Sequence, residues 1–521
     1  MAQVPGFLRS LLRRWTVLGA WLLALLLAWL PASAQQAATA PPAAPPQNKL
    51  QTDSAARERD NERRESHLSR QDAEALFHSV DSILRFASDD TRLPVRQPVQ
   101  RALASRDQVE HYVEDEMRKD KESGRFKRAQ SVLQKFGLIP RDLDLEALMV
   151  ELMREQVAGY YDPKKQTFYM LDWIAPEVQR PVIAHELTHA LQDQSVGLEK
   201  WLKDPNADDP PDLDPDLAAD EQATARTAVT EGQATVVMLD YLLQPGGRTV
   251  ATAQDYVNTF EQGMLQSSNF PVFSNSPRYI KEMLIFPYRY GLDFVRDVMI
   301  EKGKEDAFLG LLQHPPSTTR EIMEPKVYLA GEHLAPLRLP PLAKLLGTRY
   351  PRYDVGAMGE FDVKVLLEQF AGEKAAGKIS PHWRGGYYYA VVRPEALPGK
   401  AADGAALRKQ ALPPASLALL YVSRWDSSES AEKFAHAYAA MLPQRYPGVQ
   451  RAPRNPNPQN FAERVANHTE WRTDEGPVFV ESWGETVLVM ESFDPDTAAR
   501  LRDAVLERSG EGPEPALGKQ P

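Results

Sequence analysis

The spacing of apolar residues along the first half of the chain alternates between helical and strand-like segments. Helical spacing begins near Asp72 and continues through Leu84, and it returns in residues 143–158. Residues 95–103 have a strand-like composition, and the capping box that follows predicts a helix over residues 105–121. This mixture predicts an α+β fold.

The middle of the chain is predicted to contain a hairpin and three long helices. Two aromatic, β-prone runs flank the turn sequence at residues 162–165 and predict a β-hairpin. Residues 181–194 then carry apolar side chains around most of a helix, as in a buried helix. Another long helix is expected over residues 218–243, and a further one is expected to begin at Phe286.

The pattern changes after Pro351, where strands become more frequent. Strands are predicted in GYYYAVVR, SLALLYVSRW, PVFVES and TVLVMESF, and helices after Asp426 and over residues 495–508. We therefore expect a second α+β domain. It contains no metal or nucleophile motif, and its tryptophans are expected to be core residues rather than a ligand platform: Trp383, Trp425 and Trp483.

Charge and composition narrow the class of protein. A net charge of −11 argues against nucleic-acid binding. An arginine-containing start, an apolar stretch at residues 15–30 and the cleavage pattern Ala32-Ser33-Ala34 predict a secreted or periplasmic protein. An uncleaved membrane anchor is the alternative, although the stretch is shorter than the roughly 20 residues of a span. The chain contains no Cys, which excludes a lipobox anchor and disulfides.

The segment PVIAHELTHALQDQ at residues 181–194 carries the strongest chemical signal. His185 and His189 lie one helical turn apart, so both imidazoles fall on one face, with Glu186 beside the first. Zinc prefers such nitrogen donors, and a neighbouring carboxylate can accept a proton from activated water. Two surface histidines are the alternative, but the apolar surroundings predict a buried pair that needs a partner. We therefore predict a zinc site here.

Glu231 is the predicted third ligand. Its neighbours three and four residues away are small, and no basic residue on the same helical face can neutralise a buried carboxylate. A metal or a distant partner such as Arg is then implied. Asp220 and Glu221 are rival ligands, but they border an acidic segment and are expected to be solvated. Gly232 weakens a helix by about 1 kcal/mol, which is tolerable if a neighbouring backbone approaches closely.

The sequence AHELTHALQDQ resembles the active-site helix of the thermolysin-like zinc peptidases, the gluzincins, and EGQAT resembles the helix of their third ligand. The resemblance implies a zincin-like domain in which His185, His189 and Glu231 hold Zn²⁺. Glu186 would then activate zinc-bound water to hydrolyse a peptide or protein substrate. The family stabilises the oxyanion with Tyr or His, so Tyr288 is the candidate for that role.

Other features of the family leave alternatives open. Tyr290 is a second candidate for the oxyanion, and both tyrosines can instead be core residues. The strand at residues 166–171 is expected to border the cleft and offer backbone groups to a peptide, unless it is an ordinary edge strand. Residues 314–332 are similar to a little-characterised group of secreted bacterial gluzincin-like proteins, in which a His is expected where Glu324 stands. His314 is the only imidazole nearby.

The chain departs from the thermolysin-like pattern at one position. Those enzymes place an Asp four residues after the third ligand to orient a zinc histidine, and here that position is Thr235. The orienting bond is then expected from Thr235, Asp193, Asp240 or a backbone carbonyl. The metzincin pattern fails, since Gln192 and Ser195 stand where it requires Gly and His.

Together these observations predict five segments: a signal peptide at residues 1–34, a Pro/Ala-rich and charged linker at 35–70, a zincin-like metallopeptidase domain with an edge hairpin, an HExxH helix and a Glu-ligand helix at 71–350, an α+β domain at 355–510 and a disordered tail at 511–521. The acidic segment at 204–221 is expected to be a solvated connection, with a calcium loop as the alternative, although it lacks the EF-hand ligand order.

A protein of another class is also compatible with these residues, namely a non-catalytic envelope binding or assembly protein that keeps the zincin fold. Glu186 favours the enzyme, because a purely structural metal site has no use for a base. The C-terminal domain is expected to pack or to bind a partner such as an envelope protein. Membrane contact is expected only if the signal segment stays uncleaved.

Overall fold

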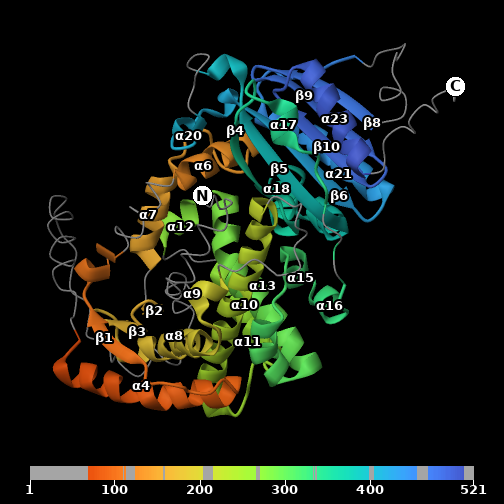
Figure 1. Ribbon diagram of the computed structural model, residues 1–521. Coiled ribbons are helices and arrows are strands. Elements are labelled where there is room, and N and C mark those ends of the chain that lie inside the picture. Colours follow the sequence, from red (N-terminus) through yellow and green to blue (C-terminus); the bar gives the residue numbers. More distant parts are fainter. Residues whose placement is uncertain are drawn as a thin grey trace, which may run out of the picture.

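The structure of the protein is a computed structural model that describes residues 68–109, 111–112, 124–156, 159–202, 215–265, 270–332, 334, 337–397, 404–453 and 467–509. The expected signal peptide, tether and C-terminal tail, and most of the acidic connection, lie outside these residues. The fold is α+β, with two sheets and long helices between them (Figure 1). Within the described ranges, no helix is long and apolar enough to cross a membrane.

The first sheet has three strands in the order β1-β3-β2 and lies beside α4 (Arg70–Thr91). Its strands are β1 (Gln100–Ala104), β2 (Tyr160–Asp162) and β3 (Thr167–Leu171). The predicted hairpin is the antiparallel pair of β2 and β3, and β1 pairs in parallel with the other side of β3. β3 is therefore the central strand. The expectation that residues 166–171 offer a free edge is wrong, and the two edge strands are β1 and β2.

Long helices join this sheet to the C-terminal half of the chain (Figure 1). Two shorter helices come first, α6 (Arg125–Phe136) and α7 (Leu145–Gln156). The long helices are α8 (Pro176–Val196), α10 (Pro215–Leu243) and α13 (Arg278–Lys302). α13 begins eight residues before Phe286, where sequence reasoning placed its start, and it continues through Pro287. A proline inside a helix removes one backbone hydrogen bond, so a helical pattern is expected to break there. Phe286, Pro287 and Tyr288 are all buried, and the helix continues within the packed core.

α10 and α13 cross with their backbones in direct contact. A Cβ atom on Gly232 would lie 2.2 Å from the carbonyl oxygen of Gly291, and one on Gly291 would lie 2.2 Å from that of Ala228. Only glycine permits so close an approach. The expectation that Gly232 admits a neighbouring backbone is thus confirmed, and the crossing fixes the position of the residues beside it.

The second sheet is antiparallel, with seven strands in the order β4-β5-β6-β10-β9-β8-β7. The strands are β4 (Arg352–Ala357), β5 (Trp383–Val392), β6 (Leu417–Trp425), β7 (Gln450–Arg451), β8 (Asn467–Thr473), β9 (Gly476–Trp483) and β10 (Thr486–Glu491). The four predicted strands and the expected burial of the tryptophans are confirmed. β4, β7 and β8 were not anticipated, since they are short or rich in polar and charged residues.

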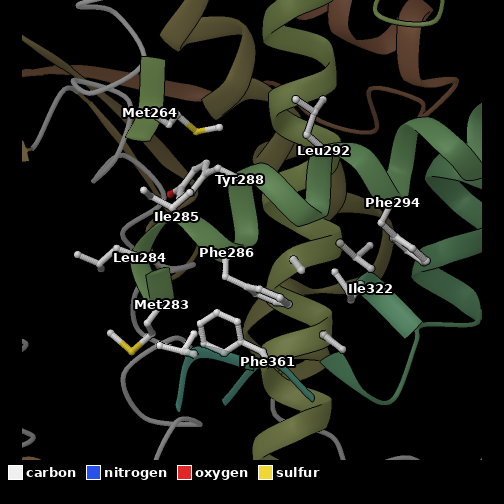
Figure 2. Packing of buried hydrophobic residues seen from close by; sticks show 14 of the residues in the cluster. Met264, Met283, Leu284, Ile285, Phe286, Tyr288, Leu292, Phe294, Ile322 and Phe361 are labelled. Atoms are coloured by element: carbon white, nitrogen blue, oxygen red, sulfur yellow. The ribbon is translucent and has the colours of Figure 1, made fainter. Parts of the chain in front are cut away.

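Helices cover both faces of this sheet. α17 (Leu342–Leu346) and α23 (Pro495–Ser509) pack against one face and share a separate apolar cluster with it. The other face packs on α18 (Glu360–Ala371) and α21 (Ser428–Arg445), and its apolar residues join the main core. Figure 2 shows the junction, where the rings of Phe286 in α13 and Phe361 in α18 lie 4.6 Å apart. The two halves of the chain therefore share one core.

Candidate metal centre

His185, His189 and Glu231 converge where α8 faces α10. The two Nε2 atoms are 3.1 Å apart, and Glu231 Oε2 lies 3.1 Å from the Nε2 of His185 and 3.5 Å from that of His189. Zinc bonds of about 2.05 Å in tetrahedral geometry separate neighbouring ligand atoms by roughly 3.3 Å. The three atoms thus form a triangle of the size that zinc requires. It is the one such group that the described residues contain.

The surroundings of the triangle suit a cation. All three side chains are at most 2% exposed. Oε1 of Glu231 is buried without a hydrogen-bond partner among the described residues, which is costly unless a positive charge compensates. Burial opposes the charged form of Glu231, but the imidazoles of His189 and His185 hold its pKa below the usual value. These residues therefore fit a divalent zinc ion.

His189 is affected by the same charges. Burial alone would lower its pKa, but the carboxylates of Glu231 and Glu186 outweigh burial and raise the pKa to about 9. A pocket with two carboxylates beside two imidazoles attracts positive charge. A divalent cation carries twice the positive charge of a proton, so it compensates the carboxylates better.

Glu186 lies beside the triangle, and one of its two carboxylate oxygens accepts a hydrogen bond. Its Oε2 accepts a hydrogen bond of 2.8 Å from the backbone N–H of Tyr161 in the edge strand β2, whereas its Oε1 is buried without a partner in the described part of the chain. Burial raises the pKa of Glu186 to about 7, and Glu231 adds to the rise, while His189 and the Tyr161 N–H oppose it. A carboxylate with a pKa near 7 is suited to exchange protons at neutral pH.

Tyr288 lies beside the group of His185, His189 and Glu231, whereas Tyr290 lies apart from it. The ring of Tyr288 stacks at 6.2 Å from the ring of His185, and burial, together with the charge of Glu231 and a hydrogen bond to it, raises the pKa of Tyr288 far above its ordinary value. Its hydroxyl therefore stays protonated and remains a donor. Tyr290 packs against Phe286 and beneath Arg289.

The partner that orients His189 was missed by sequence reasoning. Nδ1 of His189 lies 2.8 Å from Oε1 of Gln192. The hydroxyl of Thr235 donates to the carbonyl of Glu231 at 2.7 Å in its own helix. Gln192 follows His189 by three residues, so the signal that could have found it is the spacing of one helical turn.

The other two expected partners have different roles. Asp193 accepts hydrogen bonds from the Tyr161 hydroxyl at 3.0 Å and from the Leu198 N–H at 2.8 Å. Asp240 accepts from the Val250 N–H at 2.6 Å. Both carboxylates thus secure loops and strands around α8 and α10.

The rival ligands Asp220 and Glu221 are buried, so the expectation that they are solvated is wrong. Oε2 of Glu221 accepts hydrogen bonds of 2.9 Å from both the N–H and the hydroxyl of Thr319 in α15 (Thr319–Met323). Asp220 lies against β4, where a Cβ on Gly356 would come within 2.5 Å of its Oδ2. The C-terminal half of the chain covers this end of α10, which sequence alone does not reveal. Neither residue joins the metal group.

Glu324 and His314 also stay apart from the metal group. Glu324 forms an ion pair of 3.3 Å with Arg320, and burial raises its pKa although the charges of Arg320, Arg384 and His382 oppose the rise. His314 is exposed, and its carbonyl accepts a hydrogen bond from the Tyr328 hydroxyl.

Fold and site together define an α+β protein with a buried His-His-Glu group. A family model described as a domain of unknown function (DUF8575) matches residues 348–502, which include all seven strands of the second sheet. The match leaves the metal group outside. No curated protein and no solved structure matches the chain.

Proposed function

We propose that this protein is a zinc-dependent metallopeptidase of the gluzincin type. The observation that carries the proposal is the triangle of His185, His189 and Glu231, whose edges of 3.1–3.5 Å match tetrahedral zinc. Glu186 and Tyr288 beside it supply a base and a donor. A purely structural zinc site is closed by a fourth protein ligand, and no fourth ligand joins the group within the described residues.

The side chains have distinct tasks in peptide hydrolysis. Bound zinc supplies a Lewis acid that polarises the substrate carbonyl and activates water. Glu186 receives the proton of the attacking water on its unbonded Oε1 and transfers it to the leaving amine when the C–N bond breaks. The Tyr161 N–H holds the other oxygen of Glu186 in place. The Tyr288 hydroxyl donates to the carbonyl oxygen as negative charge develops there.

The test compares two kinds of variant in purified protein. His185→Ala, His189→Ala and Glu231→Ala should each remove most of the zinc, whereas Glu221→Ala should retain it. Glu186→Gln should retain zinc but lose hydrolysis of an unstructured peptide library by several orders of magnitude, as read by mass spectrometry of the products.

Two outcomes contradict the proposal in different ways. If Glu221→Ala loses zinc while Glu231→Ala keeps it, the ligand set is wrong. If the wild type holds zinc but cleaves nothing that Glu186→Gln does not also cleave, the protein is the non-catalytic binding protein instead.

We also propose that the protein acts after export, which the N-terminal sequence supports. Mass spectrometry of the exported protein should then find an N-terminus at Gln35. An intact N-terminus from Met1 would indicate a membrane-anchored protein.

A further inference from the structure

Two buried glutamines connect the metal group to a distant part of the backbone. Nε2 of Gln233 donates to the carbonyl oxygens of Ala307 and Phe308 at 2.8 and 2.9 Å, in the π-helical turn η2 (Asp306–Gly310). Nε2 of Gln192 donates to Oε1 of Gln233 at 2.9 Å. Both glutamine side chains are fully buried. The chain of amides therefore ends on backbone groups that cannot rotate.

The direction of every hydrogen bond in this row of amides follows from the backbone carbonyls of η2, where the row ends. Carbonyl oxygens only accept, so the nitrogen of Gln233 must face η2 and its oxygen must face Gln192. Gln192 must then direct its nitrogen toward Gln233 and toward the carbonyl of Thr230, which is 3.0 Å away. Its oxygen consequently faces Nδ1 of His189 at 2.8 Å. An amide oxygen needs a donor, so in neutral His189, the form that can bind a metal, the proton sits on Nδ1.

We propose that Gln192 and Gln233 are positioning residues that hold His189 in the tautomer that can bind zinc. With the proton on Nδ1, the lone pair of His189 lies on Nε2, the atom that faces His185 and Glu231. The opposite tautomer would place a hydrogen where the metal must bind. This inference rests on the proposed zinc site. It gives the bond that orients the second histidine, which Thr235 does not supply.

A zinc-affinity titration of four variants tests the inference. Gln192→Met keeps the length of the side chain but removes the acceptor, so we expect zinc affinity to fall by about 10- to 100-fold. Gln192→Glu keeps an acceptor, and in its protonated form it also keeps a donor, so most of the affinity should return. Gln233→Met should cause a smaller loss in the same direction. Thr235→Val is the matched control and should leave the affinity unchanged.

The stability of each metal-free variant is measured in parallel by urea unfolding. If the glutamines only stabilise the helices, affinity will follow stability, and Gln192→Glu will bind zinc no better than Gln192→Met at equal stability. That result overturns the inference, as does a Gln192→Met protein with wild-type affinity. If Gln192→Met does not fold, Gln233→Met decides, and unchanged affinity in that variant overturns the inference.

The same titration separates this inference from the proposed function. A wild type that holds zinc and follows the expected order of variants, but cleaves no peptide, refutes the peptidase and leaves the positioning role standing. A wild type that binds no zinc overturns both.

Discussion

The crossing of α10 and α13 makes Gly232 a sensitive point for stability and for the proposed metal site. Alanine at this position brings a Cβ to 2.2 Å from the Gly291 carbonyl oxygen, whereas real Cβ contacts essentially never fall below 3.0 Å. The helices must therefore separate by at least 0.8 Å, because a backbone carbonyl in a helix cannot rotate away. Glu231 is the adjacent residue on α10, so its carboxylate must move with the helix.

The magnitude follows from two opposing effects. Overpacking of a core costs up to about 3 kcal/mol, and the upper end applies because the clash is with backbone. Alanine regains about 1 kcal/mol of helix propensity over glycine. We expect Gly232→Ala to lower the free energy of unfolding by about 2 kcal/mol. A shift of 0.8 Å also exceeds the roughly 0.2 Å tolerance of metal–ligand distances, so zinc affinity should fall as well.

Urea unfolding and a competitive zinc titration measure the two effects. Gly377 in α19 (Glu373–Ile379) offers a matched control, because it is an exposed helical glycine with no atom within 4 Å of an added Cβ. Gly377→Ala should stabilise the protein by up to about 1 kcal/mol and leave zinc binding unchanged. If Gly232→Ala behaves like Gly377→Ala in both assays, the close crossing does not position Glu231.

Three further predictions concern other parts of the molecule. Tyr288→Phe should keep its zinc and lower kcat by about 100-fold with little change in KM, and an unchanged kcat in steady-state kinetics would remove Tyr288 from the oxyanion site. Burial raises the pKa of Glu221 from its ordinary value near 4.5 to about 8, so the stability that Glu221 contributes should decline as pH rises from about 4.5 to 8. Glu221→Gln should reduce that decline in urea unfolding at pH 6 and 9, whereas parallel curves for wild type and variant would contradict the pKa. A chain ending at residue 345 should aggregate or unfold without a cooperative thermal transition, because the shared core around Phe286 becomes exposed. A soluble fragment with a cooperative zinc-dependent transition would show that the first half folds alone.

Much of the candidate site could be predicted from sequence because it depends on local geometry. Four residues along a helix return to the same face, so His185 and His189 must lie together once α8 forms. Glu231 was identifiable because its small neighbours leave a carboxylate that needs compensation. The structure brings the three side chains together, and zinc and peptide hydrolysis stay predictions.

The strands of the C-terminal half were likewise predictable where their residues are β-branched or aromatic. β5, β6, β9 and β10 follow such runs, whereas β8 contains many polar and charged residues and gave no such signal. Strand order was not predictable, because pairing depends on which partners the whole chain brings together.

The sequence by itself therefore determined most of the long helices, the strongly apolar strands, the HExxH geometry and the residue types of the candidate ligands, since these depend on neighbours within one or two helical turns. Only the tertiary structure decided that β3 is the central strand, that Glu221 is buried against α15 and that Gln233 accepts a hydrogen bond from Gln192. Each of these depends on contacts between segments far apart in sequence. Such contacts are set by how the entire chain buries its apolar surface and pairs its buried polar groups.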